Sequence, residues 1–347
     1  MNKVFAIATR GLESICADEL AAVPGVTVEQ IAYRRIFAAC SGPLTSLLGL
    51  RTVDDIFLYA AAWPGMGRAR STLQTISAMS AQLPLDELAT VCETVRSVPK
   101  SPLFSVTANF VGRRNYSTDE IKQAIAGGVA SQLGWIYSED DSLASLNLRI
   151  FIEGETAVVG VRLGEKSLSK RSYKHSHVPG SLKPTVAAAM ACSVNVRPDM
   201  RVLDPCCGAG TILIESHAYQ AQVWGGDIDL HAVIAAQQNV ADAGAAVQLQ
   251  CWDALSLPVA DNSVDRVISN LPWGRAVSTP GTLPALYAGI GKEIKRVLAP
   301  GGQVALLTNQ PELVQIEGMK CEKKIEISLF GQTPTIQIWR NDIKGDL

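Results

Sequence analysis

The C-terminal half of the chain alternates short apolar segments with longer helical stretches, and this alternation restricts its possible folds more than any other feature. The expected strands are 201–204, 223–227, 247–251, 264–269 and 303–308, and the expected helices are 211–221, 230–243 and 283–298. Strands that alternate with helices of this length form parallel βαβ units in a doubly wound sheet. The last two segments, 324–329 and 335–339, flank a Gly-Gln-Thr-Pro turn and predict a hairpin. The sequence therefore predicts an α/β domain with a mostly parallel sheet and one antiparallel strand.

The N-terminal half has an irregular α+β pattern. Its expected strands are 4–9, 26–33 and 104–110, its expected helices are 12–22, 84–98 and 117–133, and an expected hairpin joins 146–153 to 156–163. Ser117 and Glu120 have the spacing of a capping box, which predicts that a helix begins there. A basic stretch over 165–183 follows this half, and we place the domain boundary in it.

Length and composition exclude several classes of protein. A chain of 347 residues is long enough for two or three domains, and its 47% hydrophobic content is not that of a disordered protein. No uncharged apolar run approaches the roughly 18 residues of a membrane span. None of the eight cysteines are paired as Cys-x-x-Cys, so a zinc ribbon is not expected. These features favour a protein of the reducing cytoplasm that has no membrane partner.

The stretch 166–198 carries six basic residues and no acidic one, although the whole chain has a net charge of −2. A local basic surface can bind phosphates even in a nearly neutral chain. A solvated linker explains the same composition equally well. His175 and His177 lie in this stretch without a neighbouring carboxylate, so we expect no metal site.

Polar residues stand at the ends of the expected strands. Asp204, Asp227 and Asn270 end three strands, and Asp253 follows another closely. In open α/β sheets, ligands bind beyond the carboxyl ends of the strands near the topological switch point. We expect Asp227 to accept hydrogen bonds from ribose hydroxyls and Asp253 to meet an adenine edge. The set predicts a site for an adenosyl ligand.

The turn 204–211, with the sequence Asp-Pro-Cys-Cys-Gly-Ala-Gly-Thr, refines this prediction. Gly208 and Gly210 let the backbone approach a ligand, and the amides that begin the next helix suit a carboxylate. A dinucleotide is the competing ligand, but Leu213 occupies the position of the third Gly in its fingerprint. The turn therefore favours S-adenosylmethionine. We interpret Cys206 and Cys207 as packing residues, because no partner base is evident.

Asn270-Leu271-Pro272-Trp273, at the end of the fourth expected strand, suits the methylation of an exocyclic amine. The lone pair of such an amine is delocalised into the base, so the nitrogen is a poor nucleophile. An Asn oxygen and a nearby carbonyl can accept both N–H groups and aim the lone pair at a methyl donor. Trp273 can stack on a flat base. The alternative interpretation of the tetrapeptide is a strand-end turn with a buried Trp.

The turn 204–211 and the motif 270–274 resemble those of class I methyltransferases with an Asn/Asp-Pro-Pro-Tyr-type motif, although Leu271 stands where the first Pro is common. Four further segments resemble the THUMP-domain RNA guanine-N2 methyltransferases, in particular the tRNA acceptor-stem enzymes: 9–13, 110–127, 168–174 and 180–184. The resemblance covers nearly the whole chain. It implies a ferredoxin-like domain over 1–60, a THUMP RNA-binding domain over 61–165, a basic linker over 166–183 and a methyltransferase domain over 184–347.

The resemblance also implies roles for single residues. Asn270 would orient the guanine amine, Leu271 would supply the carbonyl and Trp273 would stack on the base, while Pro272 stiffens the turn. The residues expected to bind S-adenosylmethionine are Ser181, Leu182, Asp204, Pro205, Cys206, Gly208, Ala209, Gly210, Thr211, Asp227, Ile228, Asp253, Ala254 and Asn270. The residues expected to contact RNA are Arg113, Arg114, Lys170, Arg171 and Lys174.

The expected activity is methyl transfer from S-adenosylmethionine to the exocyclic N2 of a guanosine in tRNA, at guanosine 6 of the acceptor stem. We expect a monomer with tRNA as its partner. A guanine-N2 methyltransferase for ribosomal RNA is the nearest alternative. A protein-glutamine or adenine-N6 methyltransferase would use the same motif without a THUMP domain. An RNA-binding protein with an inactive methyltransferase domain is the alternative from a different class.

Overall fold

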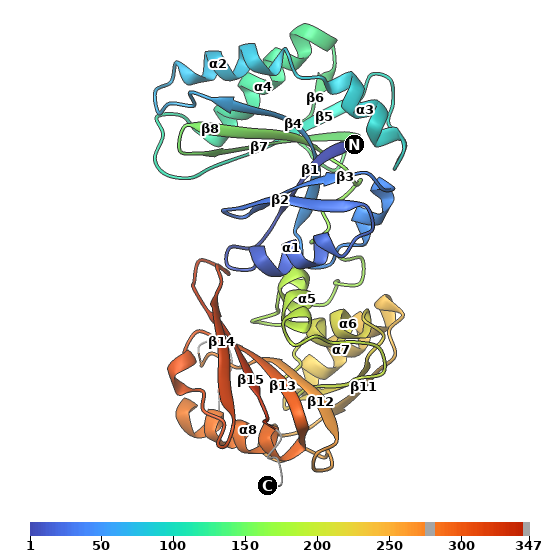
Figure 1. Ribbon diagram of the computed structural model, residues 1–347, viewed down its shortest axis with the longest axis vertical. Coiled ribbons are helices and arrows are strands. Elements are labelled where there is room, and N and C mark those ends of the chain that lie inside the picture. The colour runs from blue at the N-terminus through green and yellow to red at the C-terminus, as the bar shows by residue number, and fades with distance from the viewer. Residues whose placement is uncertain (275–281, 343–347) are drawn as a thin grey trace. The chain divides into compact units, whose positions relative to one another are not determined.

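A computed structural model describes residues 1–274 and 282–342, which form two compact units (Figure 1). The N-terminal unit comprises residues 1–7, 19–50 and 54–168. Of the described residues, the C-terminal unit comprises 8–18, 51–53, 169–274 and 282–342. Two short segments from the beginning of the chain therefore belong to the C-terminal unit. None of the helices in the described ranges is long and apolar enough to cross a membrane.

A seven-stranded sheet forms the centre of the C-terminal unit. Its strands, in spatial order, are β11 (Val247–Cys251), β10 (Gln222–Asp227), β9 (Arg201–Asp204), β12 (Val264–Asn270), β13 (Leu298–Thr308), β15 (Thr335–Arg340) and β14 (Lys320–Glu326). The first five are parallel, and β15 pairs antiparallel with both β13 and β14. The predicted α/β fold, mostly parallel with one antiparallel strand, is confirmed. From β9 the next strands along the chain, β10 and β11, extend the sheet on one side, and β12 and β13 extend it on the other. The topological switch point therefore lies between β9 and β12.

The helices of this unit are α5 (Pro184–Ser193), α6 (Thr211–His217), α7 (Leu230–Ala243) and α8 (Leu283–Val297). The predicted helix over 211–221 is too long, because the chain turns after His217 and Gln220 takes a left-handed φ of 63°. The apolar side of α8, with Tyr287, Ile290 and Ile294, packs into the core beside β12 and β13. This packing fixes the end of β12, where the predicted catalytic motif begins.

The N-terminal unit contains one continuous eight-stranded sheet (Figure 1). Its strands, in spatial order, are β2 (Val26–Ala32), β3 (Arg35–Cys40), β1 (Asn2–Ile7), β4 (Asp55–Pro64), β8 (Thr156–Arg162), β7 (Leu146–Glu153), β5 (Leu103–Phe110) and β6 (Ile136–Tyr137). Its helices are α1 (Glu13–Ala21), which begins in a segment of the other unit, α2 (Thr72–Ser80), α3 (Leu85–Glu93) and α4 (Thr118–Leu133). The predicted boundary between residues 60 and 61 falls inside β4, and the division of this half into two domains stays a prediction.

The capping box at the start of α4 is confirmed. The Ser117 hydroxyl accepts a hydrogen bond from the Glu120 amide at 3.1 Å, and the Glu120 carboxylate accepts one from the Ser117 amide at 2.8 Å. These two bonds satisfy amides that have no partner within the helix. The paired side chains explain why this helix start was readable from the sequence.

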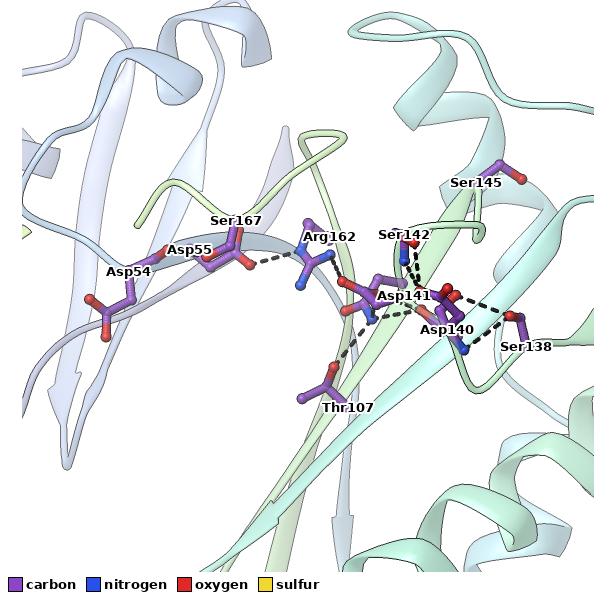
Figure 2. A network of polar contacts seen from close by, with 12 residues as sticks. Asp54, Asp55, Thr107, Ser138, Asp140, Asp141, Ser142, Ser145, Arg162 and Ser167 are labelled. Carbon is purple, nitrogen blue, oxygen red and sulfur yellow. Dashed lines mark hydrogen bonds and ion pairs between the residues drawn. The ribbon is translucent and has the colours of Figure 1, made fainter. Parts of the chain in front are cut away.

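Arg162 is the centre of a polar network in the N-terminal sheet (Figure 2). Its Nε donates to Asp55 Oδ2 at 2.8 Å, and its Nη1 donates to Asp141 Oδ2 at 2.9 Å. Burial raises the pKa of Asp55 to about 6, against the opposing effect of Arg162. The guanidinium therefore joins β4 to β8 and holds the loop that carries Asp141.

Replacing this guanidinium should destabilise the N-terminal unit strongly. Arg162→Met removes the guanidinium that is hydrogen-bonded to the buried Asp55 carboxylate, and breaking a buried ion pair typically costs about 3–5 kcal/mol. The loss should be smaller at pH 5 than at pH 7. The raised pKa of Asp55 lets the carboxyl fold protonated at low pH, and its contribution to stability falls as the pH rises through about 6. Urea unfolding at the two pH values measures both effects.

Arg70→Met is the matched control, because Arg70 pairs with Glu120 through a side chain that is 67% exposed. An exposed ion pair contributes about 0–1 kcal/mol, so this variant should unfold nearly as the wild type does. Equal unfolding free energies for the two variants would contradict a structural role for the network.

Candidate active site

A cavity of about 320 Å³ lies in the C-terminal unit at the carboxyl ends of β9, β10 and β12. This is the switch point of the sheet, where ligands of α/β proteins bind. All the residues predicted from the sequence to bind cofactor or substrate line this cavity, with the exception of Gly210. Gly210 instead begins α6 with a left-handed φ of 77°, and a Cβ there would lie 3.1 Å from the Cβ of Ala236. Gly210 thus allows close packing of the turn against α7, and its part in cofactor binding stays a prediction.

Asp204 forms a buried acceptor at the end of β9. Its Oδ1 accepts hydrogen bonds from the Cys206 amide at 3.1 Å and from the Ser269 hydroxyl at 2.7 Å. Its Oδ2 is buried and has no partner. Burial raises the pKa of Asp204 to about 7. A carboxylate oxygen left unpaired beside a cavity needs a donor or a positive charge from a ligand.

Asp227, at the end of β10, is oriented by the backbone. Its Oδ2 accepts from the Gly208 amide at 2.9 Å, and its Oδ1 accepts from the Asp229 amide at 3.1 Å. Each carboxylate oxygen can accept further hydrogen bonds, and the side chain is half-buried at the cavity wall. Asp229 has a different task, since its carboxylate caps α7 by accepting from the His231 amide at 2.9 Å.

Two apolar side chains mark the part of the cavity beside Asp253. Ile228 is 57% exposed and Leu255 is 40% exposed, although both line the cavity. The Asp253 Oδ1 accepts from the Leu255 amide at 2.9 Å, which fixes the carboxylate at the rim. Exposed apolar side chains around a positioned carboxylate suit a flat heterocycle that carries an amino group. Leu255 was not anticipated from the sequence, because a single Leu in a loop has no distinguishing pattern.

Asn270, the last residue of β12, presents a free acceptor. Its Nδ2 donates to the Gly180 carbonyl at 3.2 Å, while its Oδ1 is buried and has no partner. The next amide, of Leu271, donates to the Leu307 carbonyl at 3.0 Å and ties the turn to β13. Trp273 is half-buried at the cavity, and its Nε1 is also without a partner. The turn therefore places an unused amide oxygen beside an aromatic ring.

The Tyr287 hydroxyl holds this turn through a hydrogen bond that was not predicted from the sequence. Its hydroxyl donates to the Pro272 carbonyl at 2.9 Å and is 2.8 Å from the Thr308 hydroxyl. Tyr287 is buried in α8, and Thr308 ends β13. A Tyr at helical spacing has the pattern of an ordinary core residue, so only the structure reveals its polar contact.

Arg114, predicted to contact RNA, is engaged within the N-terminal unit. Its Nη1 donates to the Met66 carbonyl at 2.7 Å and to the Gly67 carbonyl at 3.0 Å, and its Nη2 donates to the Gly154 carbonyl at 2.6 Å. Arg113, its neighbour, is exposed. The structure thus separates the two residues, and Arg113 is the one with its side chain at the surface.

Arg171 and Lys174, also predicted to contact RNA, hold the lead-in segment to α6. The Arg171 Nε donates to the fully buried carboxylate of Glu215 at 3.1 Å. The Lys174 ammonium donates to the Leu182 carbonyl and, at 3.2 Å, to the Thr211 hydroxyl. Burial lowers the pKa of Lys174 to about 8. Lys170, in the same segment, is exposed.

Comparison with known proteins adds a second line of evidence. The family model described as the RMKL-like methyltransferase domain, UPF0020, matches residues 171–332. A tRNA (guanine(6)-N2)-methyltransferase of Thermus thermophilus is 30% identical over 313 residues, which are 88% of each chain. The tRNA (guanine(6)-N(2))-methyltransferase THUMP3 of Bos taurus is 28% identical over 227 residues, which are 60% of this chain. That match covers 44% of the bovine protein, so the chain spans less than half of its length.

The solved structures include a similar protein as well. The crystal structure of TrmN from Thermus thermophilus matches with a TM-score of 0.80 and 26% sequence identity. The match covers 98% of this chain and 100% of that one. The similarity thus extends over both units and not over the methyltransferase domain alone.

The affinity of the cavity for S-adenosylmethionine, the ligand expected from the sequence, should fall when Asp227 is changed to Ala. Charge-assisted hydrogen bonds of the kind that a ribose would donate contribute about 1.5–3 kcal/mol each. Loss of even one corresponds to a dissociation constant at least about tenfold higher. Isothermal titration calorimetry measures this change directly.

Asp229→Ala provides the control, because it removes the cap of α7 and leaves the cavity wall intact. It should lower stability by about 1 kcal/mol and leave the dissociation constant unchanged. A wild-type dissociation constant for Asp227→Ala, with a loss of binding in Asp229→Ala, would reverse the two assignments.

Proposed function

The chain belongs to the guanine-N2 methyltransferase family of its tRNA-modifying relative, and we propose that it methylates N2 of guanosine 6 in tRNA. The observation that carries the proposal is the unpartnered Oδ1 of Asn270, buried in a cavity that Trp273 also lines. An acceptor of this kind fits the exocyclic amine of a base. The similarity to a tRNA (guanine(6)-N2)-methyltransferase over 88% of both chains supports guanine in tRNA as the substrate.

The cavity fits S-adenosylmethionine as methyl donor. When bound, this cofactor supplies an electrophilic methyl group on a positively charged sulfur. Asp227 would accept from its ribose hydroxyls, and Ile228 with Leu255 would cover the adenine. The unpartnered Oδ2 of Asp204 adds a buried acceptor at the end of β9, beside the expected binding turn. The free amides at the start of α6 would meet the carboxylate of the amino-acid tail.

Asn270 and the backbone of the turn orient the guanine amine. The Asn270 Oδ1 accepts one N–H, and the Leu271 carbonyl accepts the other, which turns the nitrogen lone pair out of the base plane. The Pro272 carbonyl already accepts from Tyr287 at 2.9 Å, so its part is to hold the turn in place. Orientation of this kind supplies much of the rate enhancement. No side-chain base has to act first, because the amine becomes acidic once it is methylated.

The N-terminal unit would bind the tRNA, with residues 61–165 as a THUMP RNA-binding domain. Arg113 and Lys170 are exposed and free to contact phosphates in the manner expected from the sequence. A fragment that begins at residue 169 would lack Arg51, whose Nη2 pairs with the Glu215 carboxylate of the C-terminal unit at 2.7 Å. Experiments on RNA binding therefore need the full chain.

Methylation of defined transcripts tests the function. A tRNA transcript with guanosine 6, incubated with the protein and S-adenosylmethionine, should yield one N2-methylguanosine by nucleoside mass spectrometry. A transcript in which an A–U pair replaces this nucleotide and its partner should yield none. Methylation of ribosomal RNA with tRNA left unmodified would overturn the proposal. Absence of methylation on every RNA would favour an inactive domain.

Asn270→Ala should abolish most of the activity while cofactor binding persists. Loss of one preorganised hydrogen-bonding group at a reacting centre typically lowers the rate about 10²–10³-fold. Asn270→Asp retains an acceptor but loses the hydrogen bond that Nδ2 donates to the Gly180 carbonyl. Its methylation rate should therefore lie between that of the wild type and that of Asn270→Ala. Single-turnover methylation at saturating cofactor measures the rates. Wild-type turnover by Asn270→Ala would remove Asn270 from the mechanism.

Tyr287→Phe should slow methyl transfer without weakening the binding of either substrate. The lost hydrogen bond to the Pro272 carbonyl is worth about 0.5–1.5 kcal/mol, which corresponds to a rate about 2–10-fold lower. Tyr219→Phe is the control, since the Tyr219 hydroxyl contacts Cys192 and the residue does not line the cavity. A rise in KM at an unchanged kcat would assign Tyr287 to binding rather than to positioning.

A further inference from the structure

The hairpin of β14 and β15 ends in a tight turn that reaches the cavity. Leu329 and Gln332 exchange two backbone hydrogen bonds, of 3.1 and 2.9 Å, so only Phe330 and Gly331 form the turn. Both have left-handed backbones, with φ of 53° for Phe330 and 73° for Gly331. These are the features of a type I′ turn, whose first position favours Asn, Asp or Gly.

Phe330 is an unfavourable residue for this position. A left-handed φ is unfavourable for most residues other than Gly, Asn and Asp, and bulky side chains rarely adopt it. The Phe330 side chain is 68% exposed, so burial in the core does not offset the strain. A strained backbone that carries an exposed aromatic ring indicates a functional constraint rather than a folding one.

The turn that carries Phe330 lies at the candidate active site. Phe330 lines the same cavity as Asn270 and Trp273, but it lies on the β14–β15 hairpin and not on the turn that follows β12. Trp273 is half-buried and carries its Nε1 inside, whereas the ring of Phe330 stands at the exposed side. The cavity thus has one aromatic side chain inside and one at its open side.

This arrangement fits a base that has left a stacked helix. A base in an RNA stem cannot reach a buried amide oxygen until it is unpaired and unstacked, and enzymes that act on such bases replace the lost stacking with aromatic contacts. Resting on the proposed function, we propose that Phe330 stacks on the target guanine at the open side of the cavity. The substrate of the site is then an extruded purine nucleotide, with Trp273 as its inner contact.

Four substitutions at one position test the proposal. Phe330→Trp keeps an aromatic face, Phe330→Leu keeps an apolar side chain without one, Phe330→Ala removes the ring, and Phe330→Asn places a residue that the turn favours. Stacking of a base on an aromatic ring predicts that kcat/KM for tRNA falls about 5–150-fold in the Leu, Ala and Asn variants and stays within about threefold in the Trp variant.

Stability and cofactor binding separate this role from a structural one. Phe330→Asn relieves the backbone strain, so its melting temperature should equal or exceed that of the wild type, although its kcat/KM falls as stated above. Its dissociation constant for S-adenosylhomocysteine should not change. Ile234→Ala is the control for an exposed apolar residue, because Ile234 is 53% exposed on α7 and does not line the cavity.

Full activity in Phe330→Leu or Phe330→Asn would overturn base stacking, as would loss of S-adenosylhomocysteine binding in Phe330→Asn. Equal losses in Phe330→Trp and Phe330→Ala would overturn it as well, because the aromatic face would then have no effect. If the wild type methylates no tRNA, the proposed function fails, and this result is distinct from a normal rate in the Phe330 variants.

Discussion

The parallel pairing of β9, β10 and β12 is the constraint from which the site follows. Because the strands run in the same direction, their last residues meet at one edge of the sheet. Asp204, Asp227 and Asn270 are those residues, although 66 positions separate the first from the last in the sequence. The switch point between β9 and β12 leaves the edge open, and the cavity occupies that opening. Backbone topology thus assembles a site that no local segment contains.

Two buried oxygen atoms without partners give this edge its chemistry. The Oδ2 of Asp204 and the Oδ1 of Asn270 both remain unpaired, while the other polar atom of each side chain is held by the protein. A buried acceptor without a donor destabilises the folded state by about 1–3 kcal/mol. The Tyr287 hydroxyl and the Leu271 amide hold the turn that carries Asn270 through hydrogen bonds to Pro272 and Leu307. The unpaired atoms become useful when ligands supply the donors.

Local patterns in the sequence predicted the C-terminal sheet and most of the cavity, whereas features that depend on tertiary contact were missed. The strand ending at Asn270 was readable because it is a short apolar run followed by a turn. Strands β3 and β4 were not predicted, because their continuous apolar runs, 36–40 and 56–63, show no alternation that would distinguish a strand from a buried helix. Tyr287 and Phe330 were missed because their roles depend on where α8 and the hairpin pack. Basic residues near the linker suggested an RNA surface, but Arg171 proved to neutralise a buried Glu215.

The exocyclic amine of guanosine 6 is the proposed methyl acceptor. Substitution of this nucleotide by inosine tests it most directly, because inosine lacks the 2-amino group and keeps the rest of the purine. Methyl incorporation into a tRNA with inosine at that position should fall to background, while the matched guanosine tRNA gains one methyl group. Both tRNAs should bind with similar affinity, which a competition assay can confirm. Methylation of the inosine tRNA at the rate of the guanosine tRNA would contradict the assignment of the acceptor and the role given to Asn270.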